Sequence, residues 1–123
     1  MSFRFAIAVA VCCAVSLMAQ ARAQGEALAQ IETRVAQAML ERGGTPEDRL
    51  KLVEEGDRYL ARNPDRRLWV KLRFIESIAH FRLRKFDIAL KKADALCESE
   101  AAALFPSLLF RAETFRAVLL FHL

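Results

Sequence analysis

The sequence predicts an all-α chain, and three observations lead to that prediction. Valine, isoleucine and threonine, which favour strands, are sparse. Apolar residues recur at intervals of three and four, the period of one face of a helix. The three prolines fall between these periodic segments, at positions where helices end and begin. We therefore expect antiparallel helical hairpins joined by short links.

An amphipathic helix is predicted within residues 24–44. One stripe of it carries four apolar residues at helical spacing: Leu28, Ile31, Val35 and Met39. Gly43 and Gly44 should end the helix, because glycine adopts the left-handed conformation of a helix C-terminus without strain.

The second helix has a strong predicted start at Thr45-Pro46-Glu47-Asp48. Threonine can cap free backbone N–H groups, proline suits the first turn, and carboxylates favour the positive end of the helix dipole. Gly56 lies inside this helix, where a glycine usually lets another helix approach closely. Asn63-Pro64 should end the helix, because the residue before a proline is pushed out of the α region.

Three further helices are expected after Asp65, which should cap the first of them. The apolar residues of that helix cover more than one face, so we expect neighbours on both sides; they are Leu68, Trp69, Leu72, Phe74, Ile75, Ile78, Ala79 and Phe81. Arg84-Lys85 predicts a tight turn into a fourth helix that ends at a break over residues 98–100. Pro106 fits the first turn of a fifth helix.

Residues 1–23 have the order of a secretory signal peptide. Arg4 lies in a basic start, residues 6–19 form an uncharged and mostly apolar run, and the small-x-small sites 19–21 and 21–23 follow. The run is shorter than the ~20 residues of a membrane-spanning helix. We predict cleavage after Ala23 and a periplasmic or secreted protein. An uncleaved membrane anchor is the alternative.

Charge is distributed unevenly along the chain that remains. Residues 24–123 hold 17 basic and 15 acidic residues, a balance that argues against a nucleic-acid binder. Residues 66–92 hold nine basic and two acidic residues, a net charge of +7, whereas the flanking segments are net negative. Such a surface can attract an acidic peptide, an anionic lipid headgroup or a glycan. The alternative is an ordinary solvated helix face.

Residues with catalytic or metal-binding chemistry are scattered. His80 and His122 have no Cys, His or carboxylate neighbour at metal-ligand spacing. Cys97 is the only cysteine after the leader, so no internal disulfide is possible, and it should occupy an apolar helix position. Gly43-Gly44 follows no strand and does not form a phosphate loop. We predict no metal site, no cofactor and no catalysis.

The segment 77–90 resembles a tetratricopeptide repeat. That family has a small residue in helix A, then an aromatic residue, a tight turn and aromatic-x-x-Ala at the start of helix B. Ser77 is the small residue, Phe81 the aromatic residue, and Phe86-x-x-Ala89 begins helix B. Asn63-Pro64 resembles the proline that closes the preceding repeat.

A weaker echo lies 37 residues further on, where Leu72-x3-Glu76-Ser77 recurs as Leu109-x3-Glu113-Thr114. The family period is near 34 residues, so an extended loop around residue 106 should absorb the difference. Glu76 occupies a usually apolar position and Arg84 replaces the turn glycine, which departs from the pattern. The resemblance covers about residues 47–123. It implies that residues 45–123 hold one full repeat with partial repeats on both sides, stacked as a short α-solenoid. A simple helical bundle is the alternative.

The resemblance also implies where a partner would bind. Helix A lines the groove of this family, which places these residues at groove positions: Lys71, Phe74, Ile78, Phe81 and Arg82. We call this set the predicted groove. The asparagine of the family's carboxylate-clamp members is missing, so capture of a peptide carboxylate is not expected. In the competing interpretation Phe74 and Ile78 belong to the core. Trp69 is either a partner anchor or a core residue.

The leading functional hypothesis is an exported, non-catalytic interaction module that binds a peptide or protein partner, acidic in character, through the predicted groove. A second hypothesis is the N-terminal sensory segment of a larger exported signalling protein. A third is a stand-alone helical domain without a groove.

Overall fold

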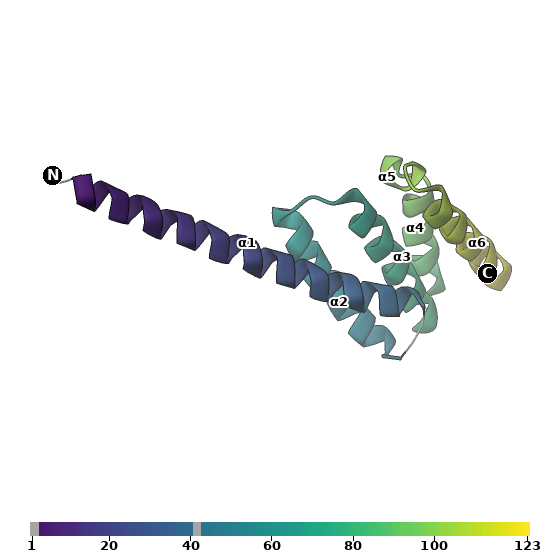
Figure 1. Cartoon of the computed structure of the whole chain (residues 1–123). Coiled ribbons are helices and arrows are strands. Elements are labelled where there is room, and N and C mark those ends of the chain that lie inside the picture. Colours follow the sequence, from purple (N-terminus) through teal and green to yellow (C-terminus); the bar gives the residue numbers. More distant parts are fainter. Residues whose placement is uncertain (1–2, 41–42) are drawn as a thin grey trace. The chain divides into compact units, whose positions relative to one another are not determined.

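The computed structural model describes residues 3–40 and 43–123, and within them every regular element is a helix. The predicted all-α fold class is confirmed (Figure 1). The helices are α1 (Phe3–Met39), α2 (Pro46–Arg62), α3 (Arg66–Arg82), α4 (Phe86–Cys97), α5 (Glu100–Ala103) and α6 (Pro106–His122). The chain divides into two compact units, Met1–Gln30 and Ile31–Leu123, and α1 contributes to both.

In the described residues, the first unit is a helix with an exposed apolar surface. Side chains such as Val11, Val15 and Leu17 are about half exposed or more. By length and composition the helix from Arg4 to Met39 could cross a membrane, and an N-terminal signal sequence meets the same criteria. An apolar N-terminal helix is therefore confirmed, and α1 continues through Ala23 without a break.

The second unit begins with the last turns of α1, where the predicted apolar stripe is buried at Ile31, Val35 and Met39. The helix ends at Met39, a few residues before the glycines. Gly43 and Gly44 both have positive φ angles, 67° and 78°, so they turn the chain towards α2.

The structure confirms the predicted N-terminal caps of α2 and α3. Thr45 and Asp48 form a capping box, in which the Asp48 amide donates to Thr45 Oγ1 at 3.1 Å and the Thr45 amide donates to Asp48 Oδ2 at 3.3 Å. Asp65 caps α3 by accepting from the Leu68 amide at 3.0 Å. Asn63, before the proline, is the last cap residue of α2.

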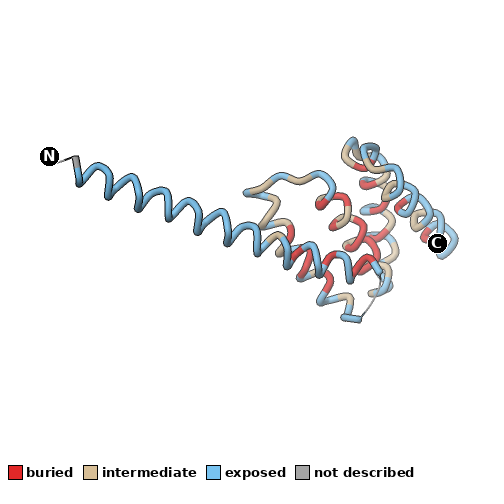
Figure 2. The backbone as a smooth tube through the Cα atoms, viewed as in Figure 1, coloured by how far each residue is buried: buried red, intermediate tan, exposed pale blue. Residues whose placement is uncertain are grey.

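Helices α2, α3 and α4 pack in succession, and α6 packs mainly on α4. Figure 2 shows the buried residues concentrated along α3 and on the sides of α2 and α4 that face it. Gly56 lies directly against Leu72: a Cβ atom at Gly56 would come within 2.4 Å of Leu72 Cδ1. The predicted close approach at this glycine is confirmed.

The turn between α3 and α4 is tight, as predicted, although it lacks a glycine. Arg84 adopts φ 60°, a left-handed conformation that costs an L-residue energy. The Arg84 amide donates to Phe81 O and the Lys85 amide donates to His80 O, both at 2.9 Å. These two bonds form a Schellman motif, which holds Arg84 in the position where glycine is usual.

The link before α6 differs from the extended loop that the spacing predicted. Ser99 caps the one-turn helix α5 by accepting from the Ala102 amide at 3.2 Å. Ala102 is fully buried, and α5 contacts α3, α4 and α6. The residues between α4 and α6 therefore form a helical turn that packs against α3, α4 and α6, because alanine favours the helical conformation.

Candidate interaction surfaces

The predicted groove consists largely of residues that hold the fold together. Phe74 and Ile78 are each only 7% exposed. Phe81 is half-buried, Lys71 is half-buried, and Arg82 is exposed. The two apolar residues at the centre of the stripe therefore face the core, as the competing interpretation has it. Arg82 is the one residue of the predicted groove that is exposed.

Phe81 belongs to an aromatic cluster that joins three helices. Its ring centroid lies 5.5 Å from Phe86, 5.6 Å from Phe115 and 5.4 Å from His122. Phe86 and His122 are stacked with an interplanar angle of 7°. This cluster packs on a buried core of Ala89, Ala93 and Leu119. Phe81 at the end of α3 therefore lies close to Phe86 and Ala89 at the start of α4, across the tight turn.

A chain of ion pairs explains the carboxylate at the usually apolar position 76. Arg73 donates from Nη2 to both carboxylate oxygens of Asp57, at 2.5 and 2.7 Å. Glu76 lies 3.7 Å from Arg73 and 3.4 Å from Lys92, so the chain of charges links α2, α3 and α4.

His80, one turn after Glu76 on α3, is partly buried, and this burial lowers the pKa of its imidazole. The charge of Glu76 opposes the lowering of the pKa, and the charges of Lys85 and Lys92 reinforce it.

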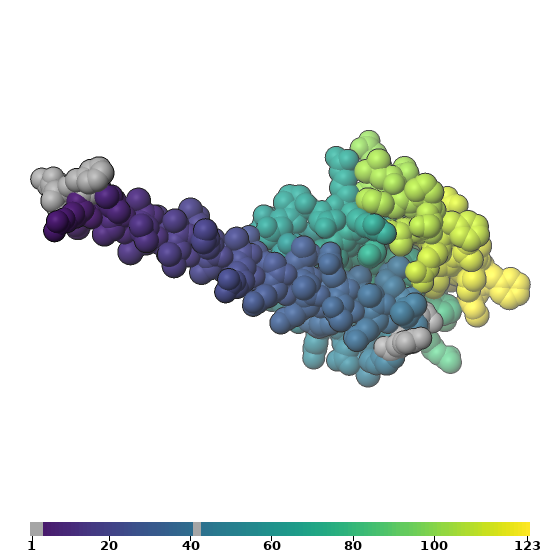
Figure 3. Space-filling view, viewed as in Figure 1, coloured from purple at the N-terminus to yellow at the C-terminus, as the bar shows by residue number. Residues whose placement is uncertain are grey.

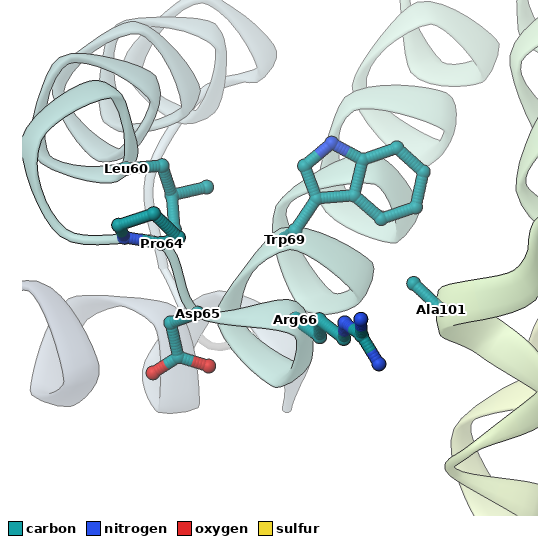
Figure 4. A pocket seen from close by; sticks show the side chains of 6 residues that line it. All are labelled: Leu60, Pro64, Asp65, Arg66, Trp69 and Ala101. Atoms are coloured by element: carbon teal, nitrogen blue, oxygen red, sulfur yellow. The ribbon is translucent and has the colours of Figure 1, made fainter.

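An apolar pocket opens where α2 turns into α3 and meets α5. It has a volume of about 280 Å³, and its lining residues are Leu60, Pro64, Asp65, Arg66, Trp69 and Ala101. Figure 4 shows the side chains of Leu60 and Pro64 on one side of the hollow and the indole of Trp69 on the other. Trp69 is half-buried, so the structure places it at the wall of an open pocket.

Two arginines flank Trp69 along α3, one turn on each side. The guanidinium carbon of Arg73 lies 5.9 Å from the Trp69 ring centroid, and the same guanidinium forms an ion pair with Asp57. Arg66 is exposed at the rim, and the described part of the chain offers it no ion-pair partner. Asp65 also lines the pocket, but its carboxylate caps α3. The rim therefore presents one available cation beside an apolar hollow.

The outer face of α6 is a second apolar surface, and sequence reasoning did not single it out. Phe110 is 69% exposed and Phe121 is 89% exposed, and Val118 and Leu120 are also exposed. The opposite face of α6 is buried at Ala112 and Leu119. The sequence does hold one indication of this face. Thr114 is the counterpart of Ser77 in the repeated pattern, and Ser77 lies where α3 contacts another helix.

The remaining candidate groups, His80, Cys97 and His122, lie on α3, α4 and α6. No group of three His, Cys, Asp or Glu side chains in this part of the chain could hold a metal ion. Cys97 is half-buried, and burial raises the pKa of its thiol, which disfavours the reactive thiolate.

Comparison with known proteins gives no assignment: no family model, curated protein or solved structure matches the chain.

Proposed function

We propose that the protein is an exported, non-catalytic interaction module that binds a segment of a partner protein at the Trp69 pocket. The observation that carries the proposal is the position of Trp69, the only tryptophan of the chain, in the wall of an open apolar pocket beside Arg66. Tryptophan and arginine are the residue types most enriched among those that dominate binding at protein interfaces.

The dimensions of the pocket support a peptide as its occupant. At about 280 Å³ it lies at the small end of small-molecule sites, and it fits one apolar side chain. The partner would insert an apolar residue between Leu60 and Trp69 and place an acidic group beside Arg66. The net charge of +7 over residues 66–92 would then steer acidic partners towards this face.

We also propose that the hairpins are tetratricopeptide-like repeats. Ser77 is fully buried and donates from Oγ to the Ala89 carbonyl at 2.9 Å, so a small residue allows α3 and α4 to approach closely. The partner site proposed at Trp69 lies on the corner between two hairpins, outside the predicted groove.

Export through a cleaved leader is the third part of the proposal. The exposed apolar surface of residues 5–18 suits a membrane or a secretion channel. N-terminal sequencing of protein from the envelope fraction should give Gln24, or Arg22 if the earlier small-x-small site is used. Recovery of the intact N-terminus in a membrane fraction that resists alkaline extraction would instead identify a retained anchor.

The binding proposal can be tested with a random displayed-peptide library selected on residues 24–123. This fragment contains the second compact unit, which has its own core. We expect the selected peptides to share an apolar residue with an acidic residue close to it. Binding should shift the fluorescence of Trp69, and affinity should fall with added salt because Arg66 is exposed.

Two variants on α5 provide a matched control. Ala101→Phe fills the pocket and should weaken the selected peptides about tenfold or more, which corresponds to ~1.4 kcal/mol of binding free energy. Ala103→Phe adds the same side chain at an exposed position of the same helix and should leave binding unchanged. Equal binding to Ala101→Phe and wild type would show that this pocket is not the site.

A further inference from the structure

The outer face of α6 carries a stripe with a symmetric order of side chains. Phe110, Thr114, Ala117 and Phe121 follow one another at helical spacing, and all four are exposed. We call these four residues the outer stripe. A large aromatic side chain lies at each end, and two small residues lie between them.

The one polar side chain of this stripe, Thr114, already has a hydrogen-bond partner, so burial of the stripe would leave its hydroxyl satisfied. The Thr114 hydroxyl donates to the carbonyl of Phe110, one turn earlier, at 2.8 Å. Ser77, the corresponding residue of α3, uses its hydroxyl to contact α4 instead. The same sequence pattern therefore contacts another helix at Ser77 in α3 and is exposed at Thr114 in α6.

We propose that the outer stripe pairs with the same stripe of a second copy, so that two α6 helices pack antiparallel about a two-fold axis. A pairing centred between Phe115 and Arg116 sets Phe110 opposite Phe121 of the second copy. The same pairing sets Thr114 opposite Ala117, so small residues meet where the backbones cross most closely. A two-fold interface requires a surface that is complementary to itself, and this order of side chains meets that requirement.

The exposed apolar area also favours a second copy as the occupant. Glu113 borders the outer stripe on the side of Leu120, and the antiparallel pairing sets it about five residues along the helix axis, roughly 7.5 Å, from its own counterpart. The exposed parts of Phe110, Val118, Leu120 and Phe121 amount to roughly 500 Å² per copy, taking an aromatic side chain as about 200 Å², and this is the most that the pairing could bury. The total of about 1,000 Å² for two copies lies below the size of stable specific interfaces and is typical of weak association, so we expect a dimer in the micromolar range.

Figure 3 shows α6 at the surface of the molecule in that view, with no other segment in front of it. The outer stripe shares no residue with the Trp69 pocket, which is lined by residues from α2, α3 and α5 and by the link that precedes α3.

Sedimentation of residues 24–123 between about 1 and 200 µM tests the pairing, because a micromolar dimer dissociates over that range. We expect a monomer–dimer equilibrium. Ala117→Arg should leave a monomer at every concentration, with the helical content of the wild type. Ala95→Arg, at an exposed alanine of α4, should leave the dimer intact.

The register is tested by mixing two charged variants. Thr114→Glu and Ala117→Arg should each be monomeric alone and should form a heterodimer when mixed, because residue 114 of one copy faces residue 117 of the other. A wild-type chain that stays monomeric at about 200 µM would overturn the proposal. A dimer that survives Ala117→Arg would also overturn it, because the contact would then lie elsewhere.

Discussion

Helices α3 and α6 share a short sequence pattern, but Ser77 and Leu72 of the α3 copy are buried, whereas among the described residues Glu113 and Thr114 of the α6 copy are exposed. Ser77 in α3 is fully buried against α4, whereas Thr114 in α6 is exposed. Glu76 lies within ion-pair distance of Arg73 and Lys92, whereas Glu113 is exposed. The pattern thus marks a helix surface suited to a neighbour, and the burial of that surface depends on whether a neighbour is present.

The largest expected difference is between a packed phenylalanine on α4, the helix that covers α3, and an exposed phenylalanine on α6. Phe86→Ala should lower the free energy of unfolding by about 3 kcal/mol, because it removes a ring packed on Phe81 and stacked with His122. Phe110→Ala should cost less than about 0.5 kcal/mol, measured in urea at concentrations where the chain is monomeric. Equal costs for the two variants would mean that the contrast between covered and open faces is wrong.

The next difference concerns the small residues themselves. Ser77→Leu should destabilise the fold by about 2 kcal/mol, because the larger side chain forces α3 and α4 apart and the hydroxyl bond to the Ala89 carbonyl is lost. Thr114→Leu should leave the stability of the monomer within about 0.5 kcal/mol of wild type. Thermal unfolding of both variants at low concentration makes the measurement. A large loss at Thr114 would show that this position is already covered.

A smaller effect is expected at the turn that keeps the α3–α4 hairpin closed. Arg84→Gly should stabilise the protein by about 0.5–1 kcal/mol, because glycine adopts the positive φ angle of this residue without steric cost. Lys85→Gly, one residue later, has an ordinary φ of −91° to preserve and should be destabilising. The two variants are compared by urea unfolding. A loss of stability in Arg84→Gly would indicate that the arginine side chain contributes more than its backbone strain costs.

The smallest effect concerns pH. Burial lowers the pKa of His80 in the folded state below its ordinary value of 6.5. As pH falls through about 6.5 the unfolded chain therefore takes up its proton first, and stability decreases until the folded imidazole is also protonated. Urea unfolding between about pH 7.5 and 5.5 should show this decrease, and His80→Gln should flatten it. An unchanged slope in His80→Gln would assign the decrease to other groups.

Much of the fold could be predicted because its helix boundaries are encoded locally. The caps at Thr45 and Asp65 and the stop at Asn63 depend on residues within four positions of one another, so the sequence displays them directly. Helix α5 was missed because a one-turn helix has no period to detect, and its formation depends on contacts with α3, α4 and α6.

The candidate site was harder to predict. The stripe through Phe74 and Ile78 has the periodicity of a groove and equally that of a core face, and periodicity does not say which side of a helix is covered. The Trp69 pocket brings together residues of α2, the link that follows it, α3 and α5. Residues that are distant in sequence meet there only because the helices pack as they do.

The sequence by itself determined the helical class, the caps, the apolar N-terminal segment and the close approach at Gly56. Each of these follows from short-range rules of backbone conformation, capping and composition. Only the tertiary structure decided that Phe74 and Ile78 are core residues, that Glu76 lies among paired charges, that Trp69 opens onto a pocket and that the outer face of α6 is uncovered. Burial is a property of the assembled helices, because whether a side chain meets water depends on which other helix lies against it.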